Sequence, residues 1–465
     1  MAEGQRLWRQ ADEYYESMKR LQTQVTKLGK DIRPWAPLDE KKKSWDLEDQ
    51  LQQATQNWQY THDLAADATL AAFEFMPHFG PARRQLAEMY IQISQHFEQL
   101  GRTTAAAYHW TRVALFDDGT YAAIIKGDGA LTLETSPPGA DVSCYRYVEK
   151  DRVLIPAEEQ ALGKTPLKDV SIPMGSYLLI LKKAGFRDTR YPIYISRQHR
   201  WITEQPANLY TDEEIGADFC YVPAGSFIFG GDSEAPGSGP KQVRDLSEFA
   251  IGQENVLGLN YLEFINILQL QNAEEAAARA PRRMDGSSEV IQDKNGVWKF
   301  PPHDHEQISF TARRPLSGIS WHDAQAYAHW VGQRHRAEIR LPTQEEREKA
   351  ARGVDGRFFS WGNQPEFSFA NMRLSRPQAA PSEAGEFPHD RSPYNVWDVC
   401  GNMSNWTSSG VGGLRFIAGG NWSGTSGTAR LAHCGRFAPE VASNWIGCRL
   451  LKELPGSRSH AKPKK

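Results

Sequence analysis

The chain has 465 residues, a length that allows two to four domains. Its 54 basic and 57 acidic residues leave a formal net charge of −3, so no overall field favours nucleic acid or an anionic membrane as a partner. No apolar run reaches about 18 residues, and the N-terminus lacks the charged-then-apolar pattern of a signal peptide. The five cysteines include no C-x-x-C pair. We therefore expect reduced, mostly buried thiols in a cytoplasmic protein.

Residues 1–118 predict an α-helical region. Two apolar seams recur at alternating four- and three-residue spacing, which predicts two helices packed as an antiparallel hairpin. Coiled-coil dimerisation is the alternative interpretation of this pattern. Residues 81–116 then resemble a single tetratricopeptide-type hairpin, which implies a docking surface for a protein partner. The first seam comprises Leu7, Ala11, Tyr14, Met18, Leu21, Val25 and Leu28, and the second extends from Leu47 to Phe75.

Residues 129–205 change to a strand-like pattern of β-branched and aromatic runs separated by Gly and Pro. The turn Pro137-Pro138-Gly139-Ala140 is similar to the motif that names PEGA domains. The resemblance implies a small β-sandwich-like module that acts as a spacer or a surface-binding unit. The expected strands lie at Leu131–Thr135, Asp141–Tyr147, Met174–Lys183 and Tyr191–Ile195.

The stretch Asn395–Leu451 carries Gly, Asn and Trp at a density that no ordinary helix tolerates, which predicts loops packed by their own side chains. Together with CYVPAGSFIFGGD, ISWHDAQAYAHWVG and RLPTQEEREKAARG earlier in the chain, it resembles the formylglycine-generating enzyme (sulfatase-modifying factor) family. The resemblance implies a C-type lectin-like domain over residues 215–453, followed by a disordered basic tail at 454–465. The expected fold class is therefore multidomain α+β, with helical hairpins, a PEGA-like module and this C-terminal domain.

Two helices and one insertion are expected inside the C-terminal domain. Ser320–Gly332 has a single apolar stripe, whereas Gln344–Arg352 mixes acidic and basic side chains and is predicted to be a charged surface helix. Residues 270–309 depart from the family pattern, and Asp293–Gly296 within them is a good turn for a β-hairpin.

Formylglycine-generating enzymes use two cysteines, shortly after a GGSW-like turn, to bind copper and activate oxygen, because a thiolate is a soft ligand and an electron donor. The matching window, Ser423–Ala429, contains no cysteine, and Cys434 and Cys448 match ordinary scaffold positions. We therefore expect neither formylglycine synthesis nor bound copper. A metal- or oxygen-dependent oxidoreductase on an altered site is the alternative.

The resemblance also implies a structural calcium site. The positions that match the family's ligands are Asp398, the carbonyl groups of Gly401 and Met403, and Asn405, which stands where the family has Glu. Calcium prefers six to eight oxygen ligands, so the exchange of a carboxylate for an amide is expected to weaken the site. The alternative is that the amide side chains tie loops to the backbone.

The surface beside the GGSW-like turn is the expected ligand-binding site. Small hydroxyl residues there alternate with large aromatic ones, which suits a surface that binds a protein or a small molecule. The pattern resembles the variable proteins of diversity-generating retroelements, which display variable residues on the same fold. The expected ligand-binding residues are Trp422, Ser423, Thr425, Ser426, Thr428, His433, Phe437 and Trp445.

The domain order favours a third function. Helical hairpins, a PEGA-like module and a sulfatase-modifying factor module together resemble the C-terminal extension of some bacterial serine/threonine kinases, although no kinase motif is present in this sequence. A regulatory partner of a bacterial kinase or protease system is therefore a further alternative. The preferred interpretation is a non-catalytic binding module.

Overall fold

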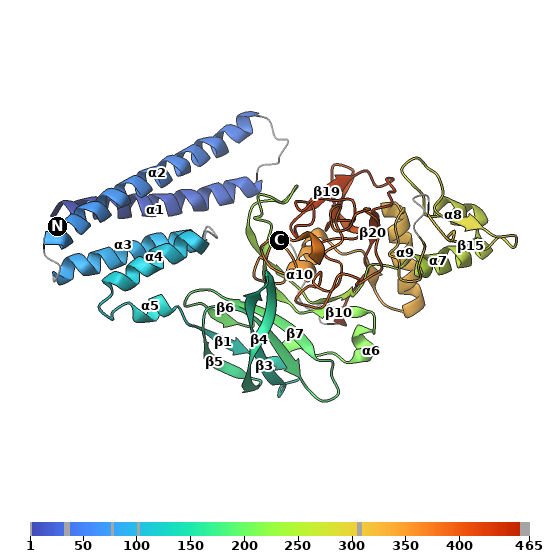
Figure 1. The fold of residues 1–465 in the computed structure, drawn as a ribbon, viewed down its shortest axis with the longest axis horizontal. Coiled ribbons are helices and arrows are strands. Elements are labelled where there is room, and N and C mark those ends of the chain that lie inside the picture. The colour runs from blue at the N-terminus through green and yellow to red at the C-terminus, as the bar shows by residue number, and fades with distance from the viewer. Residues whose placement is uncertain (1, 32–37, 76–78, 100–102, 305–308, 456–465) are drawn as a thin grey trace. The chain divides into compact units, whose positions relative to one another are not determined.

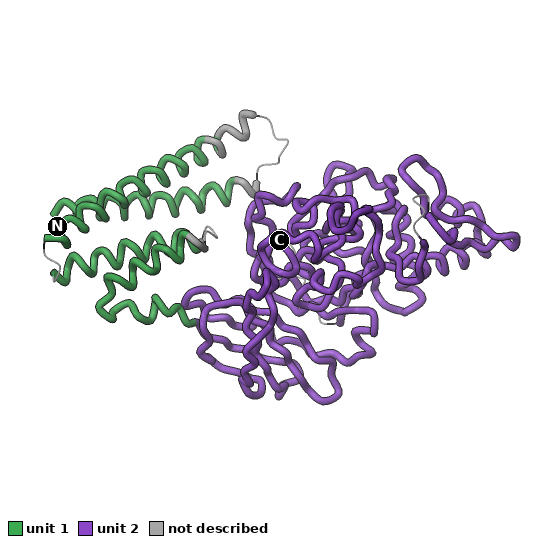
Figure 2. The backbone as a smooth tube through the Cα atoms, viewed as in Figure 1, with its two compact units in different colours: residues 1–128 green, residues 129–465 purple. Residues whose placement is uncertain are grey.

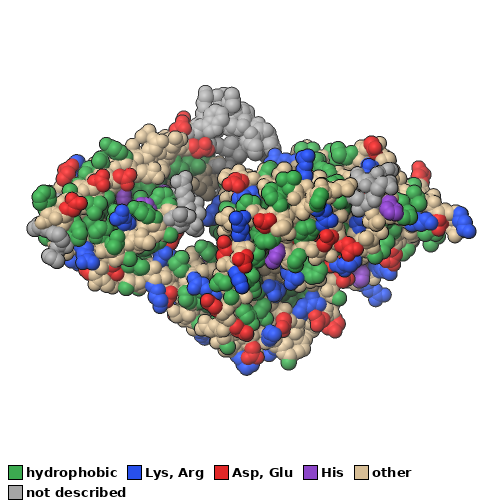
Figure 3. Space-filling view, in the orientation of Figure 1, with side chains coloured by type: hydrophobic (Ala, Val, Ile, Leu, Met, Phe, Trp, Pro, Cys, Tyr) green, Lys and Arg blue, Asp and Glu red, His purple; other side chains and the backbone are tan. Residues whose placement is uncertain are grey.

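The computed structural model describes residues 2–31, 38–75, 79–99, 103–304 and 309–455. The chain divides into two compact units, residues 1–128 and 129–465 (Figure 2). Within the described residues, no helix combines the length and apolarity needed to span a bilayer. On the face shown in Figure 3, acidic and basic side chains are interspersed, as the small net charge suggests. The predicted tail lies almost entirely outside the described residues.

The first unit is helical, as predicted (Figure 1). The predicted hairpin of two long helices forms, and a third helix packs against both of them. Trp58 is fully buried between Tyr15, whose ring lies 5.5 Å away, and Ile93 of the third helix. The first seam is therefore filled within the chain. The helices are α1 (Ala2–Asp31), α2 (Leu38–Phe75), α3 (Gly80–Gln99), α4 (Thr103–Phe116) and α5 (Ala122–Lys126).

The second unit begins with a β-rich region around an apolar core that includes Leu131, Leu179 and Ile193. A four-stranded antiparallel sheet has the order β4-β3-β6-β7, and a smaller sheet has the order β5-β1-β8. The PEGA assignment remains a resemblance. The strands are β1 (Gly129–Leu133), β2 (Thr135–Ser136), β3 (Asp141–Lys150), β4 (Val153–Lys164), β5 (Leu167–Ile172), β6 (Gly175–Lys182), β7 (Thr189–Ile195), β8 (Arg200–Ile202) and β9 (Ala207–Asn208).

The remainder of the second unit is mixed α and β with long irregular segments. One four-stranded sheet has the order β10-β13-β21-β16 and the other has the order β19-β18-β17-β20. The first group of elements is α6 (Asp212–Ile215), β10 (Phe219–Val222), β11 (Gly225–Phe229), β12 (Gln242–Leu246), β13 (Phe249–Gly252), α7 (Gly258–Gln271), α8 (Ala273–Ala278), β14 (Ile291–Gln292) and β15 (Trp298–Lys299). The second is α9 (Trp321–His335), β16 (Ile339–Arg340), α10 (Gln344–Arg352), η1 (Phe367–Phe369), β17 (Ser404–Val411), β18 (Leu414–Ala418), β19 (Cys434–Phe437), β20 (Ile446–Cys448) and β21 (Leu451–Lys452).

Two local predictions for this region are confirmed. The helix expected at 320–332 forms as α9, and Ser320 caps its N-terminus in a capping box with Asp323. The hairpin in the insertion forms between β14 and β15, where the Gly296 N–H donates to the Asp293 carbonyl at 2.9 Å.

The β-rich region is bonded to the C-terminal region at several points. The Leu154 N–H donates to the Trp361 carbonyl at 2.6 Å, and the Ser176 hydroxyl donates to Asp355 at 2.6 Å. The guanidinium of Arg357 lies 4.5 Å from the ring centre of Tyr147. These contacts hold the β-rich region directly against the C-terminal region, whereas a flexible spacer would make few such contacts.

The prediction that Gln344–Arg352 is a surface helix is wrong. The helix forms as α10, but Arg347, Lys349 and Arg352 are each at most 2 % exposed. The Lys349 ammonium donates to the carbonyls of Pro223 and Gly225, both at 2.8 Å. The helix packs against β11, β17 and β18, and Arg352 donates to the carbonyls of Gly230, Gly356 and Arg357 in the irregular segments nearby. Buried carbonyls need such donors. The basic side chains of α10 provide these donors.

Candidate functional site

The predicted ligand-binding surface starts at a tight turn in which Trp422 is held at both ends. Its backbone N–H donates to the Asn402 carbonyl, and its indole Nε1–H donates to the Asn444 carbonyl, both at 3.0 Å. Asn421, which is buried, accepts from the backbone N–H and the hydroxyl of Ser423. Trp422 itself is only half-buried. Its ring is therefore fixed while part of its surface stays open to solvent.

The hydroxyl residues that follow form a closed turn. The Thr425 N–H donates to the Thr428 hydroxyl at 2.9 Å, and that hydroxyl donates back to the Thr425 carbonyl at 3.0 Å. A Cβ atom at Gly424 would lie 2.5 Å from the same hydroxyl oxygen, so a larger residue there would displace the Thr428 side chain from this bond. Thr425 is exposed, and Ser423, Ser426 and Thr428 are half-buried. These hydroxyl groups thus lie on a surface whose backbone is rigid.

Two further aromatic residues belong to the same neighbourhood. Phe437 at the end of β19 meets Trp445 edge-to-face, with ring centres 5.6 Å apart. Both rings are half-buried and pack against the apolar core of the domain. Trp445 directly follows Asn444, whose carbonyl holds the Trp422 indole. The Trp422 indole is therefore bonded to the residue that precedes Trp445, and Trp445 contacts Phe437.

His433 has a different environment. Its Nδ1 lies 2.7 Å from the Pro236 carbonyl, and because a carbonyl only accepts, Nδ1 carries the proton. Burial lowers the pKa of the imidazole, which favours the neutral ring at neutral pH. His433 thus ties its segment to the loop at residues 232–238.

The loop at residues 232–238 is the part of this surface that the sequence did not predict. Arg430 bonds to Asp232 at 2.6 Å and to Glu234 at 2.9 Å, and the Cys434 N–H donates to the Pro236 carbonyl. The Glu234 side chain is 77 % exposed, so the loop adds an accessible carboxylate beside the turn. Its Gly- and Pro-rich composition indicates a loop, but about 200 residues separate it from its partners in the sequence.

All five cysteines are free and buried, in agreement with the expected reduced thiols. Burial raises the pKa of Cys434 to about 11 and that of Cys448 to about 12. A thiol with such a pKa stays protonated at neutral pH, whereas metal binding and oxygen activation need the thiolate. In this structure Cys434 and Cys448 act as small apolar core residues.

The four predicted calcium residues lie close together but are engaged by other groups. The Asn405 amide oxygen accepts from Arg347 Nε at 2.9 Å, and the Asn405 amide nitrogen donates to Asn255 at 2.7 Å. The Gly401 carbonyl accepts from the Met403 N–H, and one Asp398 carboxylate oxygen accepts from the Gly385 N–H. Burial raises the pKa of Asp398 to about 7, which weakens it further as an anionic ligand.

A second guanidinium occupies the other side of this region. Arg449 is fully buried and donates to the carbonyls of Gly252, Gln253 and Trp397 at 2.6–2.8 Å, and its Nη2 lies 3.4 Å from the Asp398 carbonyl. As arranged, these oxygens suit guanidinium groups and do not fit a calcium ion with six to eight oxygen ligands. The calcium site therefore stays a prediction that requires Arg347 to release Asn405. Nor do His, Cys, Asp and Glu side chains of the described residues form any group of three or more that could hold a metal.

A family model described as "Sulfatase-modifying factor enzyme 1-like domain" matches residues 205–454, more than half of the chain. The chain belongs to this family. The sulfatase-modifying factor domain thus contains the aromatic residues, four of the five buried thiols and α10, while Cys144 and the helical unit lie outside it.

Named relatives include both an inactive and an active type. The chain is 26 % identical to the "Inactive C-alpha-formylglycine-generating enzyme 2" of Bos taurus over 264 residues, which cover 49 % of this chain and 85 % of that protein. It is also 26 % identical to the "Formylglycine-generating enzyme" of Mus musculus over 216 residues, covering 40 % of this chain and 56 % of that one. Among solved structures, "Treponema denticola variable protein 1" matches with a TM-score of 0.37 and 16 % identity, covering 50 % of this chain and 94 % of that chain.

Proposed function

We propose that the sulfatase-modifying factor domain of this chain is a non-catalytic binding module that recognises a protein partner through Trp422, Phe437 and Trp445. The observation that carries the proposal is the state of these three rings. Each is half-buried, and hydrogen bonds or an edge-to-face contact hold it in place while part of its surface remains open.

Fixed aromatic side chains are effective anchors because they bury a large area at little cost in conformational entropy. The surrounding Ser and Thr hydroxyl groups add donors and acceptors that adapt to a partner. Since the backbone of the turn is already closed by the Thr425–Thr428 bonds, little ordering is needed on binding. Proteins named as inactive members of the family support a non-catalytic use of the fold.

The enzymatic alternative would need a reactive thiol or a metal at the altered site. The window Ser423–Ala429 has no cysteine, and burial raises the pKa of both Cys434 and Cys448. Oxidation chemistry on these thiols would require the core to open first. The described geometry therefore favours binding over oxidation.

Site-specific photo-crosslinking tests the proposal. A benzophenone amino acid at exposed Thr425 should crosslink a discrete partner in cells of the source organism, whereas the same group at exposed Lys294 in the insertion should not. The partner is then identified by mass spectrometry and its affinity for purified variants is measured. Truncation of an aromatic anchor typically costs about 2 kcal/mol or more, so Phe437→Ala should weaken binding at least about 30-fold. If neither Phe437→Ala nor Trp445→Ala changed the affinity for the partner, this surface would not be the partner-binding site.

A further inference from the structure

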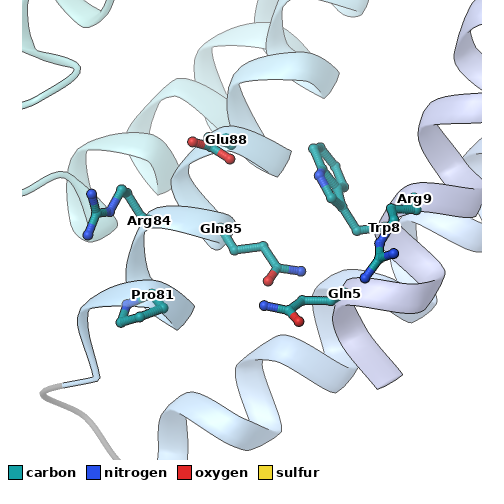
Figure 4. A pocket seen from close by; sticks show the side chains of 7 residues that line it. All are labelled: Gln5, Trp8, Arg9, Pro81, Arg84, Gln85 and Glu88. Atoms are coloured by element: carbon teal, nitrogen blue, oxygen red, sulfur yellow. The ribbon is translucent and has the colours of Figure 1, made fainter. Parts of the chain in front are cut away.

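A second candidate site lies in the helical unit, outside the sulfatase-modifying factor domain. A surface cavity of about 450 Å³ opens between α1 and α3 and is lined by side chains of both helices. Figure 4 shows Gln5 and Gln85 pointing toward each other across the gap, with Trp8 beside them. Arg9 lies on one side of these residues and Arg84 on the other. The cavity therefore combines two amide groups, an aromatic ring and two separated positive charges.

Close packing between helices fixes the floor of this cavity. A Cβ atom at Gly4 would lie 2.5 Å from the Thr69 hydroxyl oxygen, so glycine allows α1 to approach α2 closely. Gln85 is only 8 % exposed, and its amide nitrogen lies 3.4 Å from the same Thr69 hydroxyl. Trp8 meets the buried His62 edge-on at 5.9 Å. The amide group of Gln85 and the Trp8 ring are thus held in place before any ligand arrives.

The two arginines at the ends of the cavity are available to a ligand. Arg9 and Arg84 are both exposed, and within the described part of the chain neither donates to a carboxylate. Nearby Arg6, by contrast, is paired with Glu3 at 2.6 Å. The acidic residue of the lining, Glu88, accepts from the Tyr121 hydroxyl at 2.7 Å. The lining therefore carries one carboxylate, Glu88, and two guanidinium groups that form no ion pair among the described residues, although the charge of Arg84 also acts on Asp118.

These groups together specify a class of ligand. Carboxamides both donate and accept, which matches the N–H and C=O groups of a peptide backbone. Guanidinium groups bind carboxylates through charge-assisted hydrogen bonds, and two separated ones suit two separate carboxylates better than one phosphate. The Trp8 ring and Pro81 offer apolar surface to a side chain between the acidic residues.

We propose that this cavity binds an extended acidic peptide segment of a partner protein, with one carboxylate at Arg9, one at Arg84, and the backbone between them on Gln5 and Gln85. The site lies on a different unit from the aromatic surface of the C-terminal domain. It therefore adds a second recognition surface and does not depend on the function proposed above.

A random heptapeptide display library, selected on the immobilised full-length chain, tests the proposal. Selected peptides should be enriched in Asp and Glu on both sides of an apolar residue. Because one charge-assisted contact is lost, Arg9→Gln and Arg84→Gln should each weaken the binding of a selected peptide at least about tenfold. Arg20→Gln, an exposed position further along α1, is the matched control and should change affinity less than twofold.

Three results would overturn this proposal. The first is selection of no peptide, or of peptides without excess acidic residues. The second is equal binding by the wild type and the Arg9→Gln/Arg84→Gln variant, whose fold is checked by circular dichroism. The third is displacement of the selected peptide by a single-stranded oligonucleotide at equal concentration, which would identify the cavity as a general polyanion site.

Discussion

The helical unit and the sulfatase-modifying factor domain both have apolar cores, but only the second also buries several basic side chains completely. Trp58 in the first and Trp406 in the second are fully buried, and the second adds Arg347, Lys349 and Arg449. A helix satisfies its own backbone N–H and C=O groups, so helices pack well through apolar surfaces. The second domain contains long irregular segments, whose carbonyls need partners from side chains. Buried basic side chains in this domain therefore supply donors to carbonyls at strand ends and in irregular segments.

The Arg449 contacts illustrate the difference. This one side chain reaches carbonyls of the Gly252–Gln253 segment and of Trp397, segments about 145 residues apart in the chain. In the helical unit, ring contacts join Trp58 to Tyr15 and to His62, and His62 also lies 3.0 Å from the Met89 carbonyl. Changes to the two interiors should therefore have different signatures, which hydrogen exchange with mass spectrometry can follow separately in the full-length chain.

The largest expected effect is on the apolar interior. Trp58→Ala removes the fully buried indole between α1, α2 and α3 and should lower the free energy of unfolding of the helical unit by about 4 kcal/mol. Amide exchange should accelerate in α1–α3 while β17 and β18 stay protected. Tyr60→Ala, a 68 % exposed position on the same helix, is the control and should change little. Equal acceleration by both variants would contradict the packing described here.

The cationic interior should respond to loss of a donor. Arg449→Met keeps apolar volume but leaves three buried carbonyls without their partner, which should cost about 3 kcal/mol in the stability of the second unit. Exchange should accelerate in the segments around Gly252 and Trp397. Arg436→Met at an exposed position is the matched control. If Arg449→Met stabilised the domain, the buried charge of Arg449 would cost more than its hydrogen bonds contribute.

A pH effect tests the environment of His109 in the helical unit. Burial lowers the pKa of His109. The nearby His62 and Arg112 lower this pKa further, whereas Asp63 raises it. Because the folded pKa lies below the unfolded one, stability is fully present above about pH 6.5 and falls as the pH drops below that value. The change in the free energy of unfolding with pH should correspond to the uptake of at most one proton. In the His109→Gln variant, the stability measured by amide exchange in α4 during chemical unfolding should depend less on pH. If the variant showed the same pH dependence as the wild type, another group would be responsible.

The smallest expected effect concerns calcium. Because Arg347 and Arg449 already engage the candidate oxygens, a chelator should leave the melting temperature of the second unit unchanged within about 2 °C. Calorimetry on protein prepared with and without excess calcium provides the measurement. A larger drop in chelator that Asp398→Ala abolishes would instead support the calcium prediction.

Sequence patterns predicted some elements of this molecule and missed others for physical reasons. The seam from Leu7 to Leu28 is local and periodic, so the α1–α2 hairpin could be predicted directly. The helix over Gln344–Arg352 could also be predicted, but its burial could not. The carbonyls that bind Lys349 come from Pro223 and Gly225, about 125 residues earlier, and a charged side chain gives no local sign of such partners.

The same limit applies to the candidate site. Trp422, Phe437 and Trp445 lie within one short stretch whose family resemblance locates them together. The bond from His433 to Pro236 joins segments 197 residues apart, and no pattern in either segment indicates it. The family resemblance therefore indicated where these aromatic residues lie, while the neighbouring loop became visible only in the structure.

Oxidation of a cysteine-containing sulfatase peptide by the purified, copper-treated chain tests the central claim most directly, because it asks whether the family's thiol chemistry persists in this domain. With Cys434 and Cys448 buried and protonated, the chain should form no aldehyde product and should retain no stoichiometric copper after dialysis. Aldehyde formation that is lost in Cys434→Ser or Cys448→Ser, with the fold intact by circular dichroism, would contradict the binding-module account.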